Sequence, residues 1–201
     1  MATTQAPANL ILATPLKGGT GRVLPIKSVL PTGDTALAQA QMIFSGIKHL
    51  GIRHVLPHDF GTGLIRIDGV VQPSPHDPDA TGRWAFFHGT GPLGTPSVVS
   101  GRLERKGPFG DDGGTQTSHR ALLRAAVAAL RFRRRPDEAF HTLVIATADD
   151  NLTNCATTLA KTWIETGWKT SKGLLVKNRD MWEALLGEFE RYADLGMAVQ
   201  F

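Results

Sequence analysis

The sequence is poor in cysteine and contains no long apolar run. Cys155 is its one cysteine among 201 residues, which excludes an intrachain disulfide and a cysteine-rich zinc site and fits a reducing compartment. No run approaches the ~20 apolar residues of a membrane-spanning helix, so we expect no membrane association. The N-terminus lacks the early basic segment of a secretory signal. We therefore expect an intracellular protein, nuclear or cytoplasmic. The acid-poor, threonine-rich start leaves a mitochondrial location as an alternative.

Apolar residues make up 41% of the chain, which is enough to form a core, so a disordered tail is excluded. The formal net charge is +4. A modest basic excess permits an anionic partner such as nucleic acid but does not establish one.

Residues 1–60 differ from the rest of the chain in composition and sequence pattern, and they are predicted to form an N-terminal extension. Residues 1–33 are rich in proline, glycine and threonine and are typical of an extended arm. The stretch "DTALAQAQMIFSGIKH" then predicts one helix over 34–50, with Ala38, Met42 and Ile43 on one face.

Residues 61–201 are predicted to form a single α/β domain. Three strands come first, and helices alternate with strands after them. The expected strands cover 63–70, 83–89, 96–105, 141–147 and 197–201, and the expected helices cover 119–135, 151–167 and 179–196. Three consecutive strands followed by crossover units predict a mixed sheet with helices on its faces.

Two carboxylates follow the strand in "LVIATADDN", namely Asp149 and Asp150. A strand that ends in carboxylates is a common way to build a metal site. Asp is also a favoured N-cap residue, and an acid in the first turn of a helix is stabilised by the helix dipole. The residues by themselves leave both roles open.

From about Gly63 onward the sequence resembles type 1 ribonuclease H, in particular its fungal form. The matching pieces are "IRIDGVV", "GGTQTSHRALLRAAVAALRF", "LVIATADDN" and "TWIETGWKTSKGLLVKNRDMWEALL", in the order of the family. The resemblance implies a mixed five-stranded sheet flanked by helices. It also implies that the family's C-terminal helix is missing, since the sequence stops at Phe201. We expect the sheet face left open to be covered by the helix over 34–50 or by a protein partner.

The family hydrolyses the RNA strand of an RNA–DNA hybrid with two divalent ions held by carboxylates. Of the family's acids, the resemblance places the first on Asp68. The next two positions fall on Leu122 and Ala148, which cannot bind Mg²⁺, and the fourth would lie beyond Phe201. We therefore expect a nucleic-acid-binding pseudo-ribonuclease with no cofactor. If the protein is active, Mg²⁺ or Mn²⁺ would bind through Asp68. Asp149 is one residue beyond the metal position, so strand alternation favours a capping role for it.

The resemblance also implies residues that bind the substrate. Thr117 and Asn178 match a pocket for a DNA phosphate, and Gln116 and Arg120 match their neighbours. The stretch "WKTSKGLLVKN", called here the basic loop, suits contact with phosphates and with a nucleic-acid groove. The residues expected to bind in and next to this loop are Trp163, Trp168, Lys169 and Lys172.

The expected partner is an RNA–DNA hybrid or duplex RNA. Two alternative functions stay open. The first is an active metal-dependent hybrid endoribonuclease with a site rebuilt from Asp68 and Asp149, with Asp150 as a further candidate ligand. The second is a structural or protein-interaction scaffold, in which the two tryptophans only pack.

Overall fold

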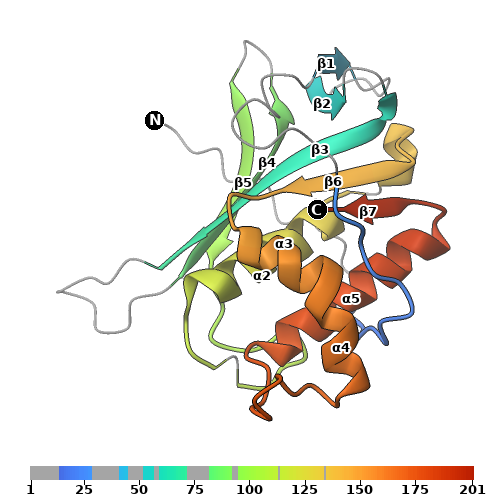
Figure 1. Cartoon of the computed structure of the whole chain (residues 1–201). Coiled ribbons are helices and arrows are strands. Elements are labelled where there is room, and N and C mark those ends of the chain that lie inside the picture. The colour runs from blue at the N-terminus through green and yellow to red at the C-terminus, as the bar shows by residue number, and fades with distance from the viewer. Residues whose placement is uncertain are drawn as a thin grey trace, which may run out of the picture.

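The structure is a computed structural model that describes residues 14–28, 41–44, 52–56, 59–71, 82–91, 95–112, 114–133 and 135–201. In these residues seven strands form one mixed sheet, and Figure 1 shows the helices gathered on one side of it. The strands are β1 (Gln41–Phe44), β2 (Ile52–Leu56), β3 (Asp59–Val70), β4 (Arg83–Thr90), β5 (Pro96–Arg102), β6 (Thr142–Ala146) and β7 (Ala198–Gln200).

The predicted mixed sheet is confirmed, but it has β1 and β2 in addition to the five predicted strands, β3 to β7. β3 pairs antiparallel with β4, and β4 pairs antiparallel with β5. β6 is parallel to β3, and β7 is parallel to β6. The alternation in "IRIDGV" explains how β3 lies, because Ile65 and Ile67 are buried while Arg66 and Asp68 between and after them are exposed.

The helices follow the predicted order. They are α2 (Ser118–Arg131), α3 (Asp150–Asn154), α4 (Ala160–Glu165) and α5 (Arg179–Asp194), with a π-helical turn at Cys155–Leu159 and a 3₁₀ turn at Arg135–Glu138. α2 is alanine-rich and almost wholly buried, which lets it approach the sheet closely. A Cβ added to Gly69 of β3 would meet the backbone of Ala121 and Leu122 in α2. In the described residues no helix is long and apolar enough to cross a membrane.

The helix predicted over 34–50 is wrong where the structure describes it. Gln41–Phe44 forms β1, paired antiparallel with β2. Met42, Ile43 and Phe44 suit a strand, and pairing with β2 outweighs the weak helical pattern of the segment. The rest of this predicted helix, and the cover it was expected to give the sheet, lie outside the described residues. β3 crosses the predicted boundary between residues 60 and 61, and β1 and β2 belong to the same sheet as β3. The division of the chain into an extension and a domain stays a prediction.

The segment from Thr14 to Ser28, called here the arm, runs over α5 to the edge of the sheet (Figure 1). Gly19 donates its backbone N–H to the Glu183 carbonyl. Oε1 of Glu190 accepts from the backbone N–H groups of Thr20 and Gly21, at 2.7 and 2.9 Å. Ile26 then forms a parallel bridge with Gln200, so the arm extends the sheet beyond β7.

Candidate functional site

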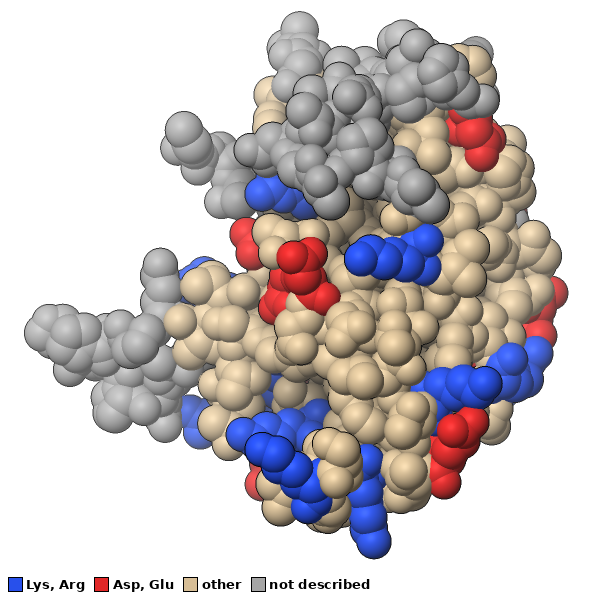
Figure 2. Space-filling model, in the orientation of Figure 1, with Lys and Arg blue, Asp and Glu red and all other residues tan. Residues whose placement is uncertain are grey.

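A hollow of about 510 Å³ opens where β3 and β6 end beside α2. It is lined by Arg66, Ile67, Asp68, Leu122, Thr147, Ala148, Asp149 and Asp150. The three positions that the resemblance assigns to family carboxylates, Asp68, Leu122 and Ala148, thus surround one space although they come from three segments. In Figure 2 a group of acidic side chains lies near the centre of the view, at the level of this hollow.

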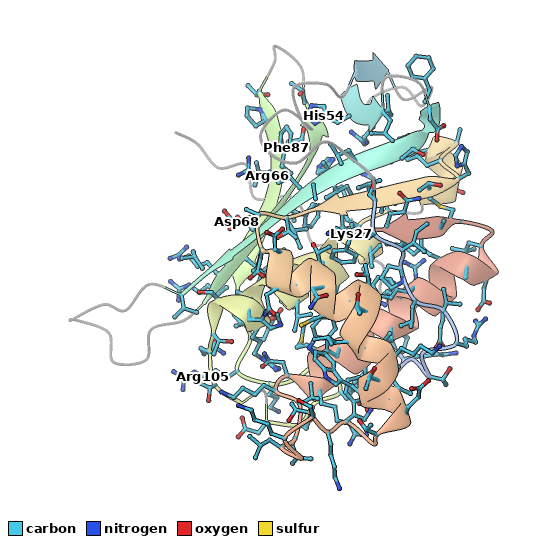
Figure 3. All side chains as sticks on the ribbon, in the orientation of Figure 1. Lys27, His54, Arg66, Asp68, Phe87 and Arg105 are labelled. Carbon is cyan, nitrogen blue, oxygen red and sulfur yellow. The ribbon has the colours of Figure 1, made fainter. Side chains whose placement is uncertain are left out.

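Asp68 is exposed, and its Oδ1 accepts the neighbouring Gly69 N–H at 2.8 Å. Arg66 is two residues earlier on the same face of β3, and Figure 3 shows the two side chains near each other. Both residues line the hollow, so an arginine shares this space with the one acid that the resemblance retains. A cation of the protein here favours an anion over a second metal ion.

Asp149 caps α3, as its position in the sequence predicts. Its Oδ1 accepts the Leu152 N–H at 2.8 Å, and its own N–H donates to Thr147 Oγ1 at 3.1 Å. Asp150 lies in the first turn of the same helix and is exposed. One carboxylate oxygen of Asp149 is thus used by the backbone, which leaves it fewer free lone pairs for any other ligand.

The donor set of the hollow does not fit the two-ion centre that the resemblance implies. Mg²⁺ binds hard oxygen ligands, and a leucine and an alanine at two family positions supply none. In the part of the chain that the structure describes, no three His, Cys, Asp or Glu side chains gather closely enough to hold a metal ion. Mg²⁺ or Mn²⁺ at Asp68 stays a prediction that applies only if the protein is active.

The residues predicted to hold a DNA phosphate meet at the N-terminal ends of α2 and α5. Thr117 caps α2, and its Oγ1 accepts the Arg120 N–H at 3.1 Å. The buried Arg120 guanidinium donates to Asn178 Oδ1 at 3.4 Å and to both oxygens of Asp180, at 2.9 and 2.5 Å. Arg120 therefore joins Thr117 to Asn178, but its charge is balanced by Asp180 rather than offered to solvent.

Gln116 is held within the fold. Its Oε1 accepts the Gly82 N–H, and its Nε2 donates to the Glu104 carbonyl, both at 3.1 Å. Both ends of the amide are used, so its present role is to fix the segment that leads into α2. Base contact by Gln116 would need these bonds to open.

The basic loop between α4 and α5 presents its lysines to solvent. Lys169 and Lys172 are exposed, whereas Trp168 is buried at the loop's base with φ 63° and the Arg179 guanidinium 5.5 Å from its ring centroid. Figure 2 shows basic side chains at the bottom of the view, where Figure 1 places this loop, and Figure 3 shows Arg105 on the same side. Trp163 instead packs edge-on against Trp182, with ring centroids 5.5 Å apart.

Two titratable side chains lie beside the start of α3. Burial lowers the pKa of His119, although the nearby Asp149 carboxylate opposes that shift. Burial raises the pKa of the Cys155 thiol to about 11, and Asp149 adds to the increase. Both groups are therefore neutral near pH 7, and the protonated thiol of Cys155 is a poor nucleophile.

Sequence reasoning missed Arg66 in the hollow and Asp180 as the partner of Arg120. The signal for Arg66 was present, because strand alternation in "IRID" puts Arg66 and Asp68 on one face. The partner of Arg120 depends on how α2 and α5 dock, and no local pattern encodes that contact.

No family model matches the chain. Among curated proteins, ribonuclease H of Geotalea uraniireducens (strain Rf4) is 39% identical over 77 residues, which are 38% of this chain and 49% of that protein. Ribonuclease H of Cereibacter sphaeroides (strain ATCC 17029 / ATH 2.4.9) is 36% identical over 76 residues, 38% of this chain and 48% of that protein. The chain spans about half the length of the curated relatives it matches.

Solved structures of low sequence identity also match. The solution structure of the PFV ribonuclease H domain has 18% identity and a TM-score of 0.44, and the match covers 68% of this chain and 76% of that one. A type 1 ribonuclease H with the type 2 active-site motif has 18% identity and a TM-score of 0.43, with 69% and 61% covered. A foamy viral protease-reverse transcriptase in complex with RNA/DNA hybrid has 12% identity and a TM-score of 0.49, with 89% and 19% covered.

The strand order and pairing define a mixed α/β protein with the ribonuclease H-like fold that the resemblance implied. Part of the chain is similar in sequence to bacterial ribonucleases H at moderate identity.

Proposed function

We propose that this protein binds an RNA–DNA hybrid or duplex RNA and has lost two-ion hydrolysis of the RNA strand. The observation that carries the proposal is the lining of the hollow at the end of β3. Asp68 stands there with Leu122 and Ala148, so two of the positions that the resemblance assigns to acids offer no oxygen to a metal ion.

The distribution of positive charge supports binding without cleavage. Lys169 and Lys172 project from the loop between α4 and α5, and neither lies against a described carboxylate within ion-pairing distance. Exposed lysines bind phosphates through charge and without reading sequence. Thr117 and Asn178 lie at the base of the same region and would take part after a rearrangement around Arg120.

Cleavage and binding are best measured together, on a labelled RNA–DNA hybrid in Mg²⁺ and in Mn²⁺. We expect binding without cleavage in either ion. The double variant Lys169→Gln, Lys172→Gln should weaken binding and should reduce the slope of log K against log salt by about one for each lysine. Lys161→Gln on α4 is the matched control, since it removes one exposed charge elsewhere.

Cleavage that disappears in Asp68→Asn would overturn the loss of hydrolysis and favour a site rebuilt from Asp68 and Asp149. If the protein neither binds nor cleaves the hybrid, the proposal as a whole is overturned and a scaffold is favoured. If the lysine substitutions leave hybrid binding unchanged, the contact surface lies away from the loop between α4 and α5.

A further inference from the structure

The side of β3, β4 and β5 that faces away from α2 carries a set of side chains aligned by the strand register. Asp68 lies opposite Ala85, which lies opposite Ser100, and Val70 lies opposite Arg83, which lies opposite Arg102. Two residues before Asp68 in β3, Arg66 lies opposite Phe87 of β4. The β3–β5 face is defined here as Arg66, Asp68, Arg83, Ala85, Phe87, Ser100 and Arg102.

The three arginines of this face differ from most others in the protein. Arg53, Arg120, Arg124, Arg131, Arg179 and Arg191 each pair with a carboxylate. Arg66, Arg83 and Arg102 are exposed and pair with none of the described carboxylates. A charge left unpaired on one face is available to an anionic partner.

The face is also hollowed beside two of its arginines, Arg83 and Arg102. A depression of about 660 Å³ is lined by Asp68, Gly69, Val70, Arg83, Trp84, Ala85, Ser100, Gly101 and Arg102. Its floor is low because the outward side chains at its centre, Ala85 and Ser100, are small. Trp84 and Val99 turn to the other side of the sheet and are buried. The result is a shallow groove with guanidinium groups along it rather than a closed cavity.

An aromatic ring lies on the same face, outside the lining of the groove and opposite Arg66. Phe87 is half-buried beside Arg66 and packs against His54, with ring centroids 4.9 Å apart. Figure 3 shows Arg66, Phe87 and His54 on the side of the strands away from the helices. The rows of Arg66 and Arg83 are four residues apart along β3, about 13 Å at the rise of a strand.

We propose that the β3–β5 face binds a single strand of nucleic acid, with its phosphates on Arg66, Arg83 and Arg102 and a base against Phe87. A basic groove combined with an aromatic ring is the arrangement that holds single strands without sequence preference. The one acid, Asp68, lies at the border with the hollow beside α2, so three positive charges face one negative charge. The proposal rests on the proposed function, since it gives a nucleic-acid-binding protein a second surface distinct from the basic loop.

The test measures the fluorescence anisotropy of a short labelled oligothymidylate with the full chain, in the presence of saturating unlabelled RNA–DNA hybrid. We expect the oligonucleotide to bind while the hybrid is bound. The double variant Arg83→Gln, Arg102→Gln should weaken oligonucleotide binding about tenfold or more and leave hybrid binding unchanged. Phe87→Leu should weaken it about fivefold or more through lost stacking.

Three outcomes would overturn the inference. One is an equal loss in the control Lys161→Gln, which would indicate only the effect of net charge. Another is oligonucleotide binding that is unaffected by the arginine substitutions. The third is competition by polyglutamate as strong as that by unlabelled oligothymidylate, which would favour an acidic protein as the partner. Failure of the proposed function gives a different result from failure of this inference. In that case the wild-type protein would not bind the hybrid even when no oligonucleotide is present.

Discussion

At the scale of single residues, the carboxylate of Asp149 caps the N-terminus of α3. We expect Asp149→Ala to lower the free energy of unfolding by about 1 kcal/mol, because the Leu152 N–H would lose its acceptor. Asp149→Ser should retain most of the stability, since serine caps equally well. Urea unfolding of the three proteins checks this, and an unchanged midpoint for Asp149→Ala would contradict the capping role.

The thiol of Cys155 is expected to be unreactive in the folded protein. Burial raises its pKa to about 11, so the thiolate fraction is small at pH 8, and the side chain is 5% exposed. A disulfide reagent should therefore modify the protein slowly at pH 8 and rapidly once denaturant unfolds it. Rapid modification under native conditions would show that the segment around the π-helical turn opens readily.

The resemblance to the family, rather than local periodicity, assigned Asp68, Leu122 and Ala148 to positions of family acids, and these three residues line one hollow. Their role as positions of a metal site stays a prediction. The burial of Arg120 against Asp180 was not predictable. It arises from the docking of two helices that are distant in sequence, and tertiary contacts of this kind leave no local pattern.

At the scale of elements, the Glu190 carboxylate and the close backbone approach at Gly19 and Gly187 hold the arm on α5, beside the exposed Arg22–Asp194 pair. Oε1 of Glu190 accepts from the backbone of Thr20, Gly21 and Arg22, and a Cβ added to Gly187 would meet the carbonyl of Lys17. Close backbone approach of this kind needs glycine. The arm has no helix over Thr14–Ser28, and its docking site on α5 could not be predicted from composition.

We expect Glu190→Ala to detach the arm and to cost about 1–3 kcal/mol of stability, because several donors would lose their acceptor. Limited proteolysis should then cut within the arm much faster than in the wild-type protein. Asp194→Ala is the control. It removes an exposed pair with Arg22, which water screens, so the stability should change little. Equal sensitivity of the two variants to protease would contradict the role assigned to Glu190.

At the scale of the whole molecule, the fold brings Asp68, Leu122 and Ala148, the three positions that the resemblance assigns to metal ligands, around one hollow. We expect the double variant Leu122→Glu, Ala148→Asp to gain a Mg²⁺ site together with Asp68. Its stability should rise with Mg²⁺ by about 2.7 kcal/mol when the ion is at about 100 times its Kd. Without Mg²⁺ the crowded carboxylates should make it less stable than the wild type.

Thermal unfolding with and without Mg²⁺ measures this gain. The same double variant with Asp68→Asn added is the control, and it should lose the response to Mg²⁺. The pair Leu122→Gln, Ala148→Asn keeps the size and removes the charge, so it separates metal binding from packing. No response to Mg²⁺ in the carboxylate variant would mean that the backbone around the hollow has also moved away from a metal-binding geometry.

The contacts between the arm and α5 join residues about 170 positions apart in the chain. During synthesis the arm leaves the ribosome long before α5 exists, so it has no docking site while the sheet begins to form. Contacts of such long range are slow to close, because the entropy of a large loop must be lost first. Until α5 and β7 have been made, the apolar side chains of Leu16, Val23 and Leu24 lack much of the core that they pack against and are open to chaperones or to neighbouring chains. The elements α5 and β7, which are synthesised after the arm, thus decide when the arm becomes part of the fold.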